Sequence, residues 1–381
     1  MRVTISVFGR FHAFNLACQL SRRGHLNRLI TSYPAFEVEK YGVPKERIRA
    51  LPHYEALKRG WGRLEKWLPM EGESSWINRG FEWSASRYIP EDTDIFVGWS
   101  GTAQRGLSRA KDVGAKAVLE RGSSHIVFQR DILKKEEEKL GIDISLPDPK
   151  TVEKEKQEYE QADKIIVPSR FVENSFVEYG MEKSKLIRIP YGVNVKEFRK
   201  NKKKDDVFRV IYAGQMMLRK GVHYLLKAFY ELDLPDAELW LIGSKREEIE
   251  PYFKKYEGSF KFLGHKPQSE LYKYYSQGSV FAMCSLEEGL AMVQPQAMSC
   301  GLPLICTTNT GGEDLMSEKK EEGFVIPIRD TEKLKEKLLW CYENREACRV
   351  MGDAARRRVE KNFKWEDYGD RVVNAYSELL N

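Results

Sequence analysis

The sequence predicts an α/β protein made of two doubly wound units, each with a parallel sheet and helices on both faces. Short apolar, β-branched runs alternate with amphipathic stretches along the chain, as expected of parallel strands joined by crossover helices. The chain has 381 residues, more than one hydrophobic core usually serves. The strands fall into two sets separated by a break in periodicity, so we expect two Rossmann-like domains that face a central cleft.

Twelve strands are expected. In the first unit they are Val3–Phe8, Leu26–Thr31, Asp94–Gly98, Ala115–Leu119, Lys164–Val167 and Lys185–Ile189. In the second unit they are Phe208–Ala213, Glu238–Ile242, Lys261–Leu263, Ser279–Met283, Pro303–Thr307 and Gly323–Ile326. Between the sets, Pro190 and Gly192 interrupt the pattern. We therefore expect a first domain over residues 1–190 and a second over residues 191–364.

The last part of the chain, residues 365–381, lies beyond the last predicted strand of the second unit. Its apolar residues recur at helical spacing, from Trp365 through Tyr368 and Val372 to Tyr376. A helix with such a stripe must bury it against another surface. We expect this helix to pack back on the first domain and complete it.

The basic charge of the chain is concentrated near its start. The formal net charge is +6, and residues 1–60 contain eleven Lys and Arg against four Glu. This excess suits an anionic partner such as a lipid diphosphate, a membrane leaflet or a nucleotide, and a solvated basic face is the alternative. No nucleic-acid reader motif accompanies it, so we do not expect a nucleic-acid partner.

The six cysteines indicate neither a metal site nor a disulfide framework, because they show no CxxC spacing and no histidine at a metal-ligand spacing. They are typical of reduced thiols, and we expect a cytoplasmic protein. The apolar stretch Met1–Phe8 is too short for a signal peptide core or a membrane span. It is predicted to be the first strand.

Four tryptophans lie among basic residues within residues 54–90: Trp61, Trp67, Trp76 and Trp83. This mixture is compatible with two roles. The rings can insert into a membrane interface or hold an acceptor, or they can pack on their own domain. Peripheral contact with the cytoplasmic membrane face therefore stays an open expectation.

A proline and a glycine define a short helix in the second unit. Pro295 is tolerated only in the first turn of a helix, which places the helix start near Ala291 and Met292. Gly301 then ends the helix. The backbone N–H groups of Leu290–Val293 are therefore predicted to be free, at the carboxyl edge of a strand, to bind a phosphate group.

Glu288 stands just ahead of this helix start, and Gln296 follows eight positions later. The segment resembles the Glu-x7-Glu region of retaining GT-B glycosyltransferases of the large family 4 type, the glycosyl transferases group 1. The resemblance implies that Glu288 contacts the donor sugar and that position 296 binds the ribose hydroxyls. Gln296 departs from the family's Glu: it keeps an acceptor oxygen but not the charge, which weakens that bond by roughly 1 kcal/mol. A glutamine on the outer face of the helix is the alternative.

A second segment opens the second unit with a strand, a loop that carries adjacent cations, and a helix. The family usually has an Arg just after one glycine and a Lys just before the next, and both reach the donor diphosphate. Lys220, which precedes Gly221, matches that Lys. Gln215 stands at the Arg position, and Arg219 is our proposed substitute. Fixed cations there would stabilise the charge that grows on the leaving diphosphate.

Four further positions are assigned more loosely. Gly9 follows the first strand and would let the backbone approach a donor phosphate. Gly264 lies where relatives bind the nucleotide base. The family often has a histidine on the first-domain side of the cleft, near the donor sugar. His125 is our candidate for it, and a histidine that caps a helix is the alternative. His12 is a second candidate, for acceptor contact, with a purely structural role as its alternative.

The resemblance implies a retaining glycosyltransferase that moves a sugar from a nucleoside-diphosphate sugar, UDP- or GDP-type, to a hydroxyl of a glycan, lipid-linked or small-molecule acceptor. It implies front-face attack without a metal or another cofactor, with Glu288, Lys220 and His125 in catalysis. The sequence shows no serine-hydrolase elbow, which is compatible with a mechanism that needs no enzyme nucleophile. Two alternatives stay open: a binding or scaffold subunit that has lost activity, and another enzyme on the same fold, such as a nucleotide-sugar epimerase or a phosphorylase.

Overall fold

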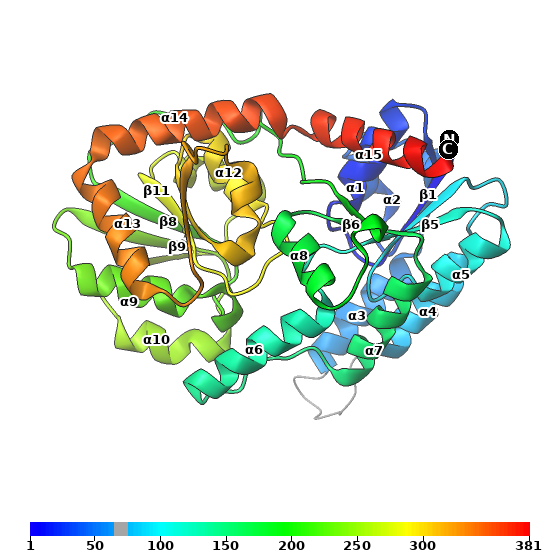
Figure 1. Cartoon of the computed structure of the whole chain (residues 1–381), viewed down its shortest axis with the longest axis horizontal. Coiled ribbons are helices and arrows are strands. Elements are labelled where there is room, and N and C mark those ends of the chain that lie inside the picture. The colour runs from blue at the N-terminus through cyan, green and yellow to red at the C-terminus, as the bar shows by residue number, and fades with distance from the viewer. Residues whose placement is uncertain (65–74) are drawn as a thin grey trace.

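The computed structural model describes residues 1–64 and 75–381 and contains two parallel sheets, one in each half of the molecule (Figure 1). The first sheet has the strand order β3-β2-β1-β4-β5-β6-β7 and the second the order β10-β9-β8-β11-β12-β13. Neighbouring strands are parallel throughout both sheets. The two predicted doubly wound α/β units are thus confirmed.

The strands of the first sheet are β1 (Val3–Val7), β2 (Leu26–Thr31), β3 (Ile48–Ala50), β4 (Ile95–Trp99), β5 (Lys116–Glu120), β6 (Lys164–Val167) and β7 (Leu186–Arg188). Those of the second are β8 (Phe208–Ala213), β9 (Ala237–Ile242), β10 (Lys261–Gly264), β11 (Val280–Met283), β12 (Leu304–Thr307) and β13 (Gly323–Ile326). The helices of the first half are α1 (Ala13–Arg22), α2 (Ala35–Glu39), α3 (Pro52–Leu64), α4 (Ser75–Ser86), α5 (Gln104–Asp112), α6 (Ile126–Leu140), α7 (Pro149–Gln161) and α8 (Arg170–Glu178). Those that follow are α9 (Val222–Leu232), α10 (Glu250–Lys255), α11 (Leu271–Tyr275), α12 (Val293–Ser299), α13 (Thr331–Glu343), α14 (Arg345–Asn362) and α15 (Trp365–Leu380).

All twelve predicted strands are present, and their ends agree with the prediction to within one residue. The central strand β1 is buried at every position, as expected where helices cover both faces of a parallel sheet. The sequence did not reveal β3, an edge strand of three residues that are exposed or half-buried. Such a strand carries no apolar run by which it can be recognised. The predicted boundary between residues 190 and 191 falls in the connection between β7 and β8.

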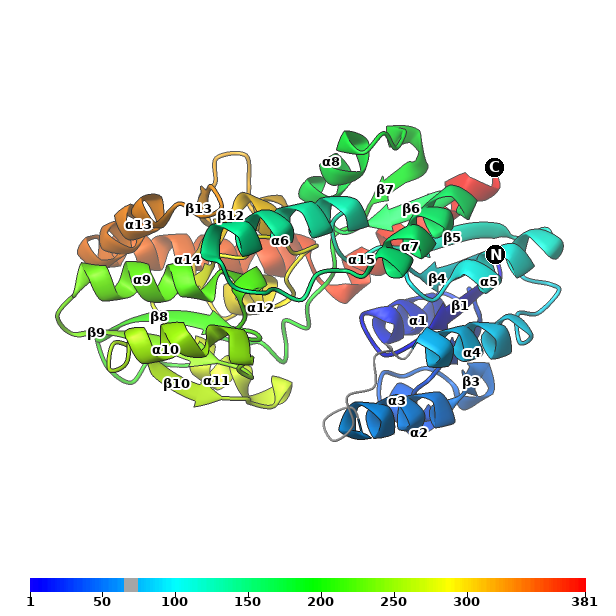
Figure 2. The ribbon, with the colours of Figure 1, turned by 90° about the horizontal axis from the view of Figure 1, so that it is seen from below.

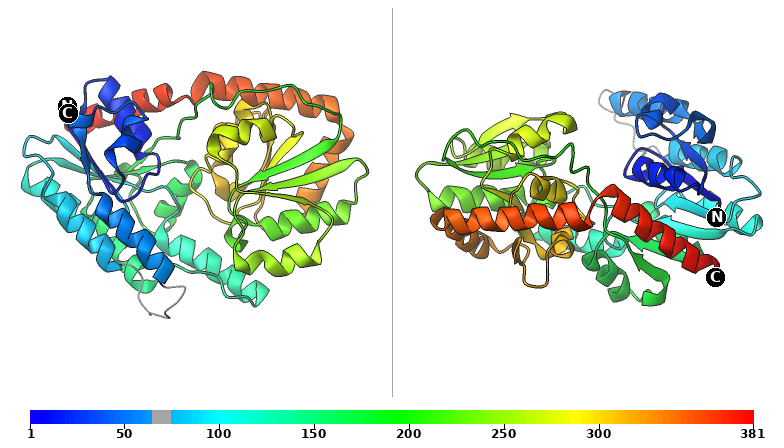
Figure 3. Two further views of the ribbon diagram at one scale, coloured as in Figure 1. Left: turned by 180° about the vertical axis from the view of Figure 1, so that it is seen from behind. Right: turned by 90° about the horizontal axis from the view of Figure 1, so that it is seen from above.

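The last helix, α15, crosses from the second domain and packs on α1 of the first, as predicted (Figure 3). Its residues Val372 and Tyr376 are fully buried. The guanidinium of Arg23 on α1 donates to Asp370 at 2.6 Å. At the crossing, a Cβ atom on Gly192 would lie 2.6 Å from the Cα atom of Trp365, so this close approach requires glycine.

The tryptophan segment lies on α3 and α4. Phe81 is fully buried, whereas Trp76 and Trp83 are each 46% exposed. The ring of Trp61 lies 5.8 Å from that of Trp76, and Trp67 falls outside the described residues. The segment therefore packs one face on its domain and leaves two indole rings half exposed. Within residues 1–64 and 75–381, none of the helices is long and apolar enough to cross a membrane.

Two buried carboxylates join the domains, and the first belongs to Glu287. Its Oε1 atom accepts from the Ser123 hydroxyl at 2.6 Å and from the Ser124 N–H at 2.8 Å. Its Oε2 atom pairs with Arg219 at 3.1 Å. Burial raises the pKa of Glu287, but Arg219, the two serines and Arg121 outweigh burial, and the net effect lowers this pKa. The carboxylate therefore stays charged at the domain interface.

The second interdomain carboxylate is Glu136 of α6, a helix of the first half that extends below the second domain in the view of Figure 1 and is seen from below in Figure 2. Glu136 is fully buried and hydrogen-bonds to His223 at 3.0 Å and Tyr224 at 2.6 Å. Arg329 donates to its other oxygen at 2.5 Å. Burial raises the pKa of Glu136, but these three partners together lower it to about 2.

His125 caps the N-terminus of α6. Its Nδ1 atom accepts from the Val127 N–H at 3.3 Å, and its ring stacks on Tyr179 with centroids 4.9 Å apart. The residue is buried. Burial, together with Arg121 and Lys156, lowers the pKa of His125 to about 4. The geometry therefore favours the cap over the catalytic role that we predicted for His125.

We expect Glu287→Gln to lower the free energy of unfolding by about 2 kcal/mol, because it leaves Arg219 without its buried counter-charge. The matched control is Glu313→Gln, which removes a carboxylate from an exposed pair with Lys320 at 2.8 Å. That change should cost less than about 0.5 kcal/mol. Urea unfolding followed by circular dichroism measures both. Equal effects of the two substitutions would contradict a buried interdomain charge.

The pKa of His125 predicts a loss of stability in mild acid. The folded-state pKa lies below the usual value near 6.5, so the unfolded chain binds a proton that the folded chain does not. As the pH falls from 6.5 towards 4, this group should cost roughly 2 kcal/mol. His125→Asn keeps a capping oxygen but cannot titrate.

Urea unfolding at pH 7.5, 6 and 5 should therefore show a steeper loss in the native protein than in His125→Asn. Other groups titrate equally in both proteins, so the difference isolates His125. Parallel stability curves would show that this histidine titrates normally.

Candidate functional site

A cavity of about 1470 Å³ lies between the domains. From the first domain it is lined by Arg10, Phe11, His12, Trp99, Ser100, Arg121, Gly122 and Ser123, and from the second by Arg219, Gln268, Ser269, Glu288, Met292 and Gln296. These residues end or follow β1, β4 and β5 in one sheet, and follow β8, β10 and β11 in the other. The strand order reverses between β1 and β4 and between β8 and β11, and ligands of open α/β sheets bind at such points. The volume exceeds the roughly 300–1,000 Å³ of common small-molecule sites.

Close backbone approaches build the second domain's side of the cavity. Gly221 has a φ of +64°, and a Cβ atom there would collide with the carbonyl group of Cys284. The N–H of Leu286 donates to the carbonyl oxygen of Arg219 at 2.9 Å. A Cβ atom on Gly289 would likewise collide with a backbone carbonyl of the first domain. These contacts hold the loop after β8 against the loop after β11, at the domain interface.

Two cations and two carboxylates meet where these loops touch. The ammonium group of Lys220 donates to Glu288. Arg219 pairs with Glu287 at 3.1 Å and lies 3.9 Å from Glu288. Burial and the neighbouring Arg219 lower the pKa of Lys220, and Glu287 opposes this shift. The predicted Arg219, Lys220 and Glu288 are therefore brought together, and with Glu287 their charges balance.

The predicted helix start is also present, slightly later in the chain. The helix α12 spans Val293–Ser299, and Met292 is its N-cap. The N–H groups of Leu290 and Met292 have no hydrogen-bond acceptor among the described residues, whereas that of Ala291 lies 3.4 Å from the carbonyl oxygen of Thr310. Of these two unpaired backbone donors, only that of Met292 belongs to a residue that lines the cavity.

Gln296 faces the same cavity from α12. It is only 5% exposed, and its Oε1 atom has no hydrogen-bond partner in the described part of the chain. A buried acceptor without a donor is costly, and its lack of a partner points to a ligand that donates hydrogen bonds. The alternative of a glutamine on the outer face of the helix is wrong.

The other predicted residues lie outside this group. The Gln215 side chain does not line the cavity, and its carbonyl oxygen accepts from the Tyr212 hydroxyl at 2.9 Å. Gly264 ends β10 with a φ of +68°. Gly9 borders a separate, smaller cavity. His125 is absent from the cavity lining because its side chain serves the α6 cap.

His12 does line the cavity, unlike His125. Its Nε2 atom lies 3.2 Å from Oε2 of Glu120, and its ring packs on Tyr191 with centroids 4.2 Å apart. The Oε1 atom of Glu120 is buried and has no partner among the described residues. The geometry therefore brings His12, our second histidine candidate, to the first domain's side of the cavity.

The roles of Glu287 and Arg121 were not predicted from the sequence. Arg121 pairs with Glu155 at 2.6 Å and donates to the carbonyl oxygen of Ser124 at 3.0 Å. It thereby shapes the loop that carries the Glu287-binding serines. The adjacent acidic pair at positions 287 and 288 was a signal, but nothing in the sequence tells which of the two side chains is buried.

No group of three or more potential metal ligands occurs in the part of the chain that the structure describes. The sequence contains one Asp-x-Asp triplet, at Asp92 and Asp94. Both aspartates pair with Arg2, at 3.1 and 3.2 Å. They precede β4 and so lie at the amino edge of the sheet, away from the cavity.

Comparison with known families gives one match, to the family described as Glycosyl transferases group 1, over residues 194–358. Curated relatives include the GDP-mannose-dependent monoacylated alpha-(1-6)-phosphatidylinositol monomannoside mannosyltransferase of Corynebacterium glutamicum. It is 29% identical over 209 residues, 49% of this chain and 54% of the relative. Sulfoquinovosyl transferase SQD2 of Arabidopsis thaliana is 32% identical over 169 residues, 43% of this chain and 32% of the relative. The chain spans about half the length, or less, of the curated relatives it matches.

Solved structures with the same fold cover nearly the whole chain. Sucrose-phosphate synthase from Thermosynechococcus elongatus has a TM-score of 0.74 at 18% identity, and the match covers 100% of this chain and 99% of that one. Anabaena HepE in complex with UDP has a TM-score of 0.69 at 15% identity, over 99% and 100% of the two chains. Residues 194–358 are thus similar to the glycosyl transferases group 1, and the whole chain has the GT-B fold.

Proposed function

We propose that this chain is a retaining glycosyltransferase that moves a sugar from a nucleoside-diphosphate sugar in the interdomain cavity to a hydroxyl acceptor. The observation that carries the proposal is the cluster of Arg219, Lys220 and Glu288 beside the start of α12. It combines cations and free N–H donors for a diphosphate with a carboxylate for sugar hydroxyls. The family match over the second domain supports the same activity.

In the proposed complex, the diphosphate lies between Lys220 and the N–H groups of Leu290 and Met292. In the structure, Lys220 is paired with Glu288. A diphosphate would compete for that ammonium group and leave the carboxylate free to accept hydrogen bonds from the donor sugar. Binding would therefore exchange one ion pair for another and would not bury an unpaired charge.

The unpartnered Oε1 atom of Gln296 is proposed to accept a hydrogen bond from a ribose hydroxyl. This extends the donor along α12, with the base towards the Gly264 end of the second sheet. The donor base is proposed to be uracil or guanine. One curated relative is described as GDP-mannose-dependent, and a neighbour of the same fold is described in complex with UDP.

The proposed reaction breaks the bond between the anomeric carbon and the diphosphate while the acceptor hydroxyl attacks on the same face. A donor phosphate oxygen takes the hydroxyl proton, so no enzyme nucleophile is needed. Lys220 and Arg219 stabilise the negative charge that grows on the departing diphosphate, a contribution of up to several kcal/mol. Domain closure would exclude water from the cavity and suppress hydrolysis.

We propose that no divalent ion takes part, because cations of the chain itself already stand at the diphosphate position. The acceptor is proposed to be a glycan, a lipid-linked or a small-molecule hydroxyl compound that binds on the first domain's side, near His12. We further propose that the protein works in the cytoplasm. All six cysteines are free and buried, as suits a reducing compartment.

The proposed diphosphate site predicts that Lys220→Ala removes nucleotide binding. A thermal-shift series with UDP, GDP and ADP should show a rise in melting temperature for one of them, because the ligand binds only the folded state. Lys220→Ala should lose this rise and most of the transfer activity, about 100-fold or more. The control is Lys227→Ala on α9, the helix that follows Lys220; its exposed ammonium group pairs with Glu231 at 3.8 Å.

Lys227→Ala should behave like the native protein in both assays. Native-like nucleotide binding and turnover by Lys220→Ala would refute the site. No shift with any nucleotide at millimolar concentration would favour the scaffold alternative.

The absence of a metal from the proposed mechanism predicts that a chelator changes nothing. The nucleotide-induced rise in melting temperature and the transfer rate should be the same in excess EDTA as in Mg²⁺, because the positive charge comes from side chains. A strict Mg²⁺ requirement in either assay would contradict this mechanism.

A further inference from the structure

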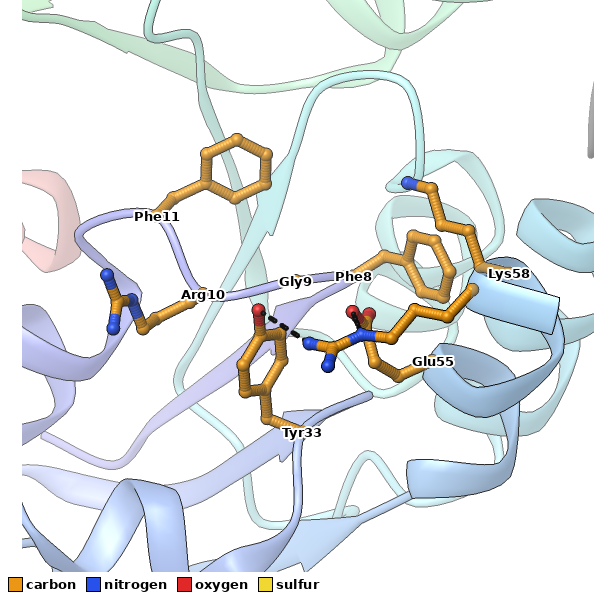
Figure 4. A pocket seen from close by; sticks show the side chains of 8 residues that line it. Phe8, Gly9, Arg10, Phe11, Tyr33, Glu55 and Lys58 are labelled. Atoms are coloured by element: carbon orange, nitrogen blue, oxygen red, sulfur yellow. Dashed lines mark hydrogen bonds and ion pairs between the residues drawn. The ribbon is translucent and has the colours of Figure 1, made fainter. Parts of the chain in front are cut away.

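A second, smaller cavity of about 380 Å³ lies at the carboxyl end of β1 in the first domain (Figure 4). The proposed reaction does not use it. Its lining combines three cations with three aromatic rings. We call it the β1 hollow and define it by Arg10, Lys58, Arg59, Phe8, Phe11 and Tyr33.

The hollow carries uncompensated positive charge. Arg59 pairs with Glu55, the one carboxylate of the lining, at 2.8 Å. The ammonium group of Lys58 lies 4.7 Å from the centre of the Phe8 ring. Neither Lys58 nor Arg10 has a carboxylate partner among the described residues. Three cations and one carboxylate leave a charge of +2, which suits an anionic ligand.

The basic excess of residues 1–60 points to the same place. Several of its other members are already paired on the surface, Arg2 with Asp92 and Arg23 with Asp370 among them. Figure 4 shows Arg10 on the loop after β1 and Lys58 on α3, on opposite sides of the hollow. Two cations that have no carboxylate partner among the described residues therefore lie on facing elements around one cavity. A basic surface that only contacts solvent would not need this arrangement.

Phe11 marks the mouth of the hollow. Its φ of +42° lies in a region that bulky L-residues rarely adopt, and its side chain is 67% exposed. The ring covers Gly9, where an added Cβ atom would lie 3.3 Å from it. Strained residues persist mainly where function requires them. An exposed ring held in this way offers an apolar surface beside the cations.

The hollow and the interdomain cavity are neighbours, because Arg10 and Phe11 line both. A ligand with its charged group in the hollow can therefore extend past Phe11 into the larger cavity. There it would meet the donor beside Arg219 and Glu288. The cations of the hollow, the Phe11 ring and the donor site thus follow one another in space. This arrangement suits an acceptor that has a charged part at one end and a reacting hydroxyl at the other.

Resting on the proposed function, we propose that the β1 hollow binds the anionic part of the acceptor, a phosphate monoester or diester, while the acceptor hydroxyl reaches into the interdomain cavity. Lys58 and Arg59 bind the phosphate oxygens, Arg10 adds positive charge at the edge of the hollow, and Phe11 packs on the adjoining carbon skeleton. The phosphate belongs either to a soluble compound or to a lipid headgroup, and the two sources share this chemistry.

The test compares Lys58→Met/Arg59→Met with the control Lys45→Met/Arg47→Met. Both remove two charges from the first domain. The control side chains are exposed and line neither cavity, and Lys58 and Arg59 do not line the larger one. The nucleoside diphosphate identified by thermal shift is present at saturation, so that the larger cavity is occupied. One arm measures binding of sn-glycerol 3-phosphate, with glycerol as the uncharged reference. The other measures co-sedimentation with vesicles of phosphatidylglycerol or of phosphatidylcholine.

We expect the native protein and the control to bind the phosphate probe in at least one arm. The hollow variant should bind it at least tenfold more weakly and should keep the nucleotide-induced rise in melting temperature. The arm that responds identifies a soluble or a lipid-borne phosphate. Equal binding by the hollow variant and the native protein, or no preference of the native protein for the phosphate probe in either arm, overturns the proposal. If the native protein binds no nucleotide while the hollow variant alone loses the phosphate probe, the donor assignment fails and the anion site stands.

Discussion

The carboxylate of Glu287 is charged although it is buried at the domain interface, and groups from both domains stabilise this charge. Serines of the first domain donate to one oxygen, and Arg219 of the second pairs with the other. An uncompensated charge there would be strongly destabilising, so the arrangement fixes the serine loop and the arginine together. Because Lys220 and Glu288 adjoin these two residues in the chain, the same interaction sets the position of the proposed donor site.

Glycines allow the backbone to come close enough for Glu287 to reach the partners in both domains. At Gly221 and Gly289 the backbone of the second domain approaches other carbonyl groups so closely that a Cβ atom has no room. The loops after β8 and β11 can therefore touch each other and the first domain. The carboxyl ends of the reversing strand pairs then face one cavity, and the C-terminal helix α15 ties the second domain back to the first (Figure 3). The fold thus places the carboxyl edges of both sheets around the same interdomain cavity.

Strong local patterns in the sequence were enough to predict most of the fold and part of the site. Buried strands have apolar runs, Lys220 matches a motif of the family, and Glu288 stands just ahead of a helix start that a proline marks, so these features could be recognised. Ile48–Ala50 could not, because an exposed edge strand has no such run. The burial of the His125 ring and the burial of Glu287 depend on contacts across more than 50 positions of the chain. Local pattern carries no information on such contacts.

A crystal structure of the protein with bound UDP or GDP would test the proposed donor site most directly. The diphosphate should lie against Lys220 and the start of α12, Glu288 should have left Lys220, and a ribose hydroxyl should donate to Gln296. A nucleotide bound elsewhere, with the Lys220–Glu288 pair intact, would contradict the proposed site.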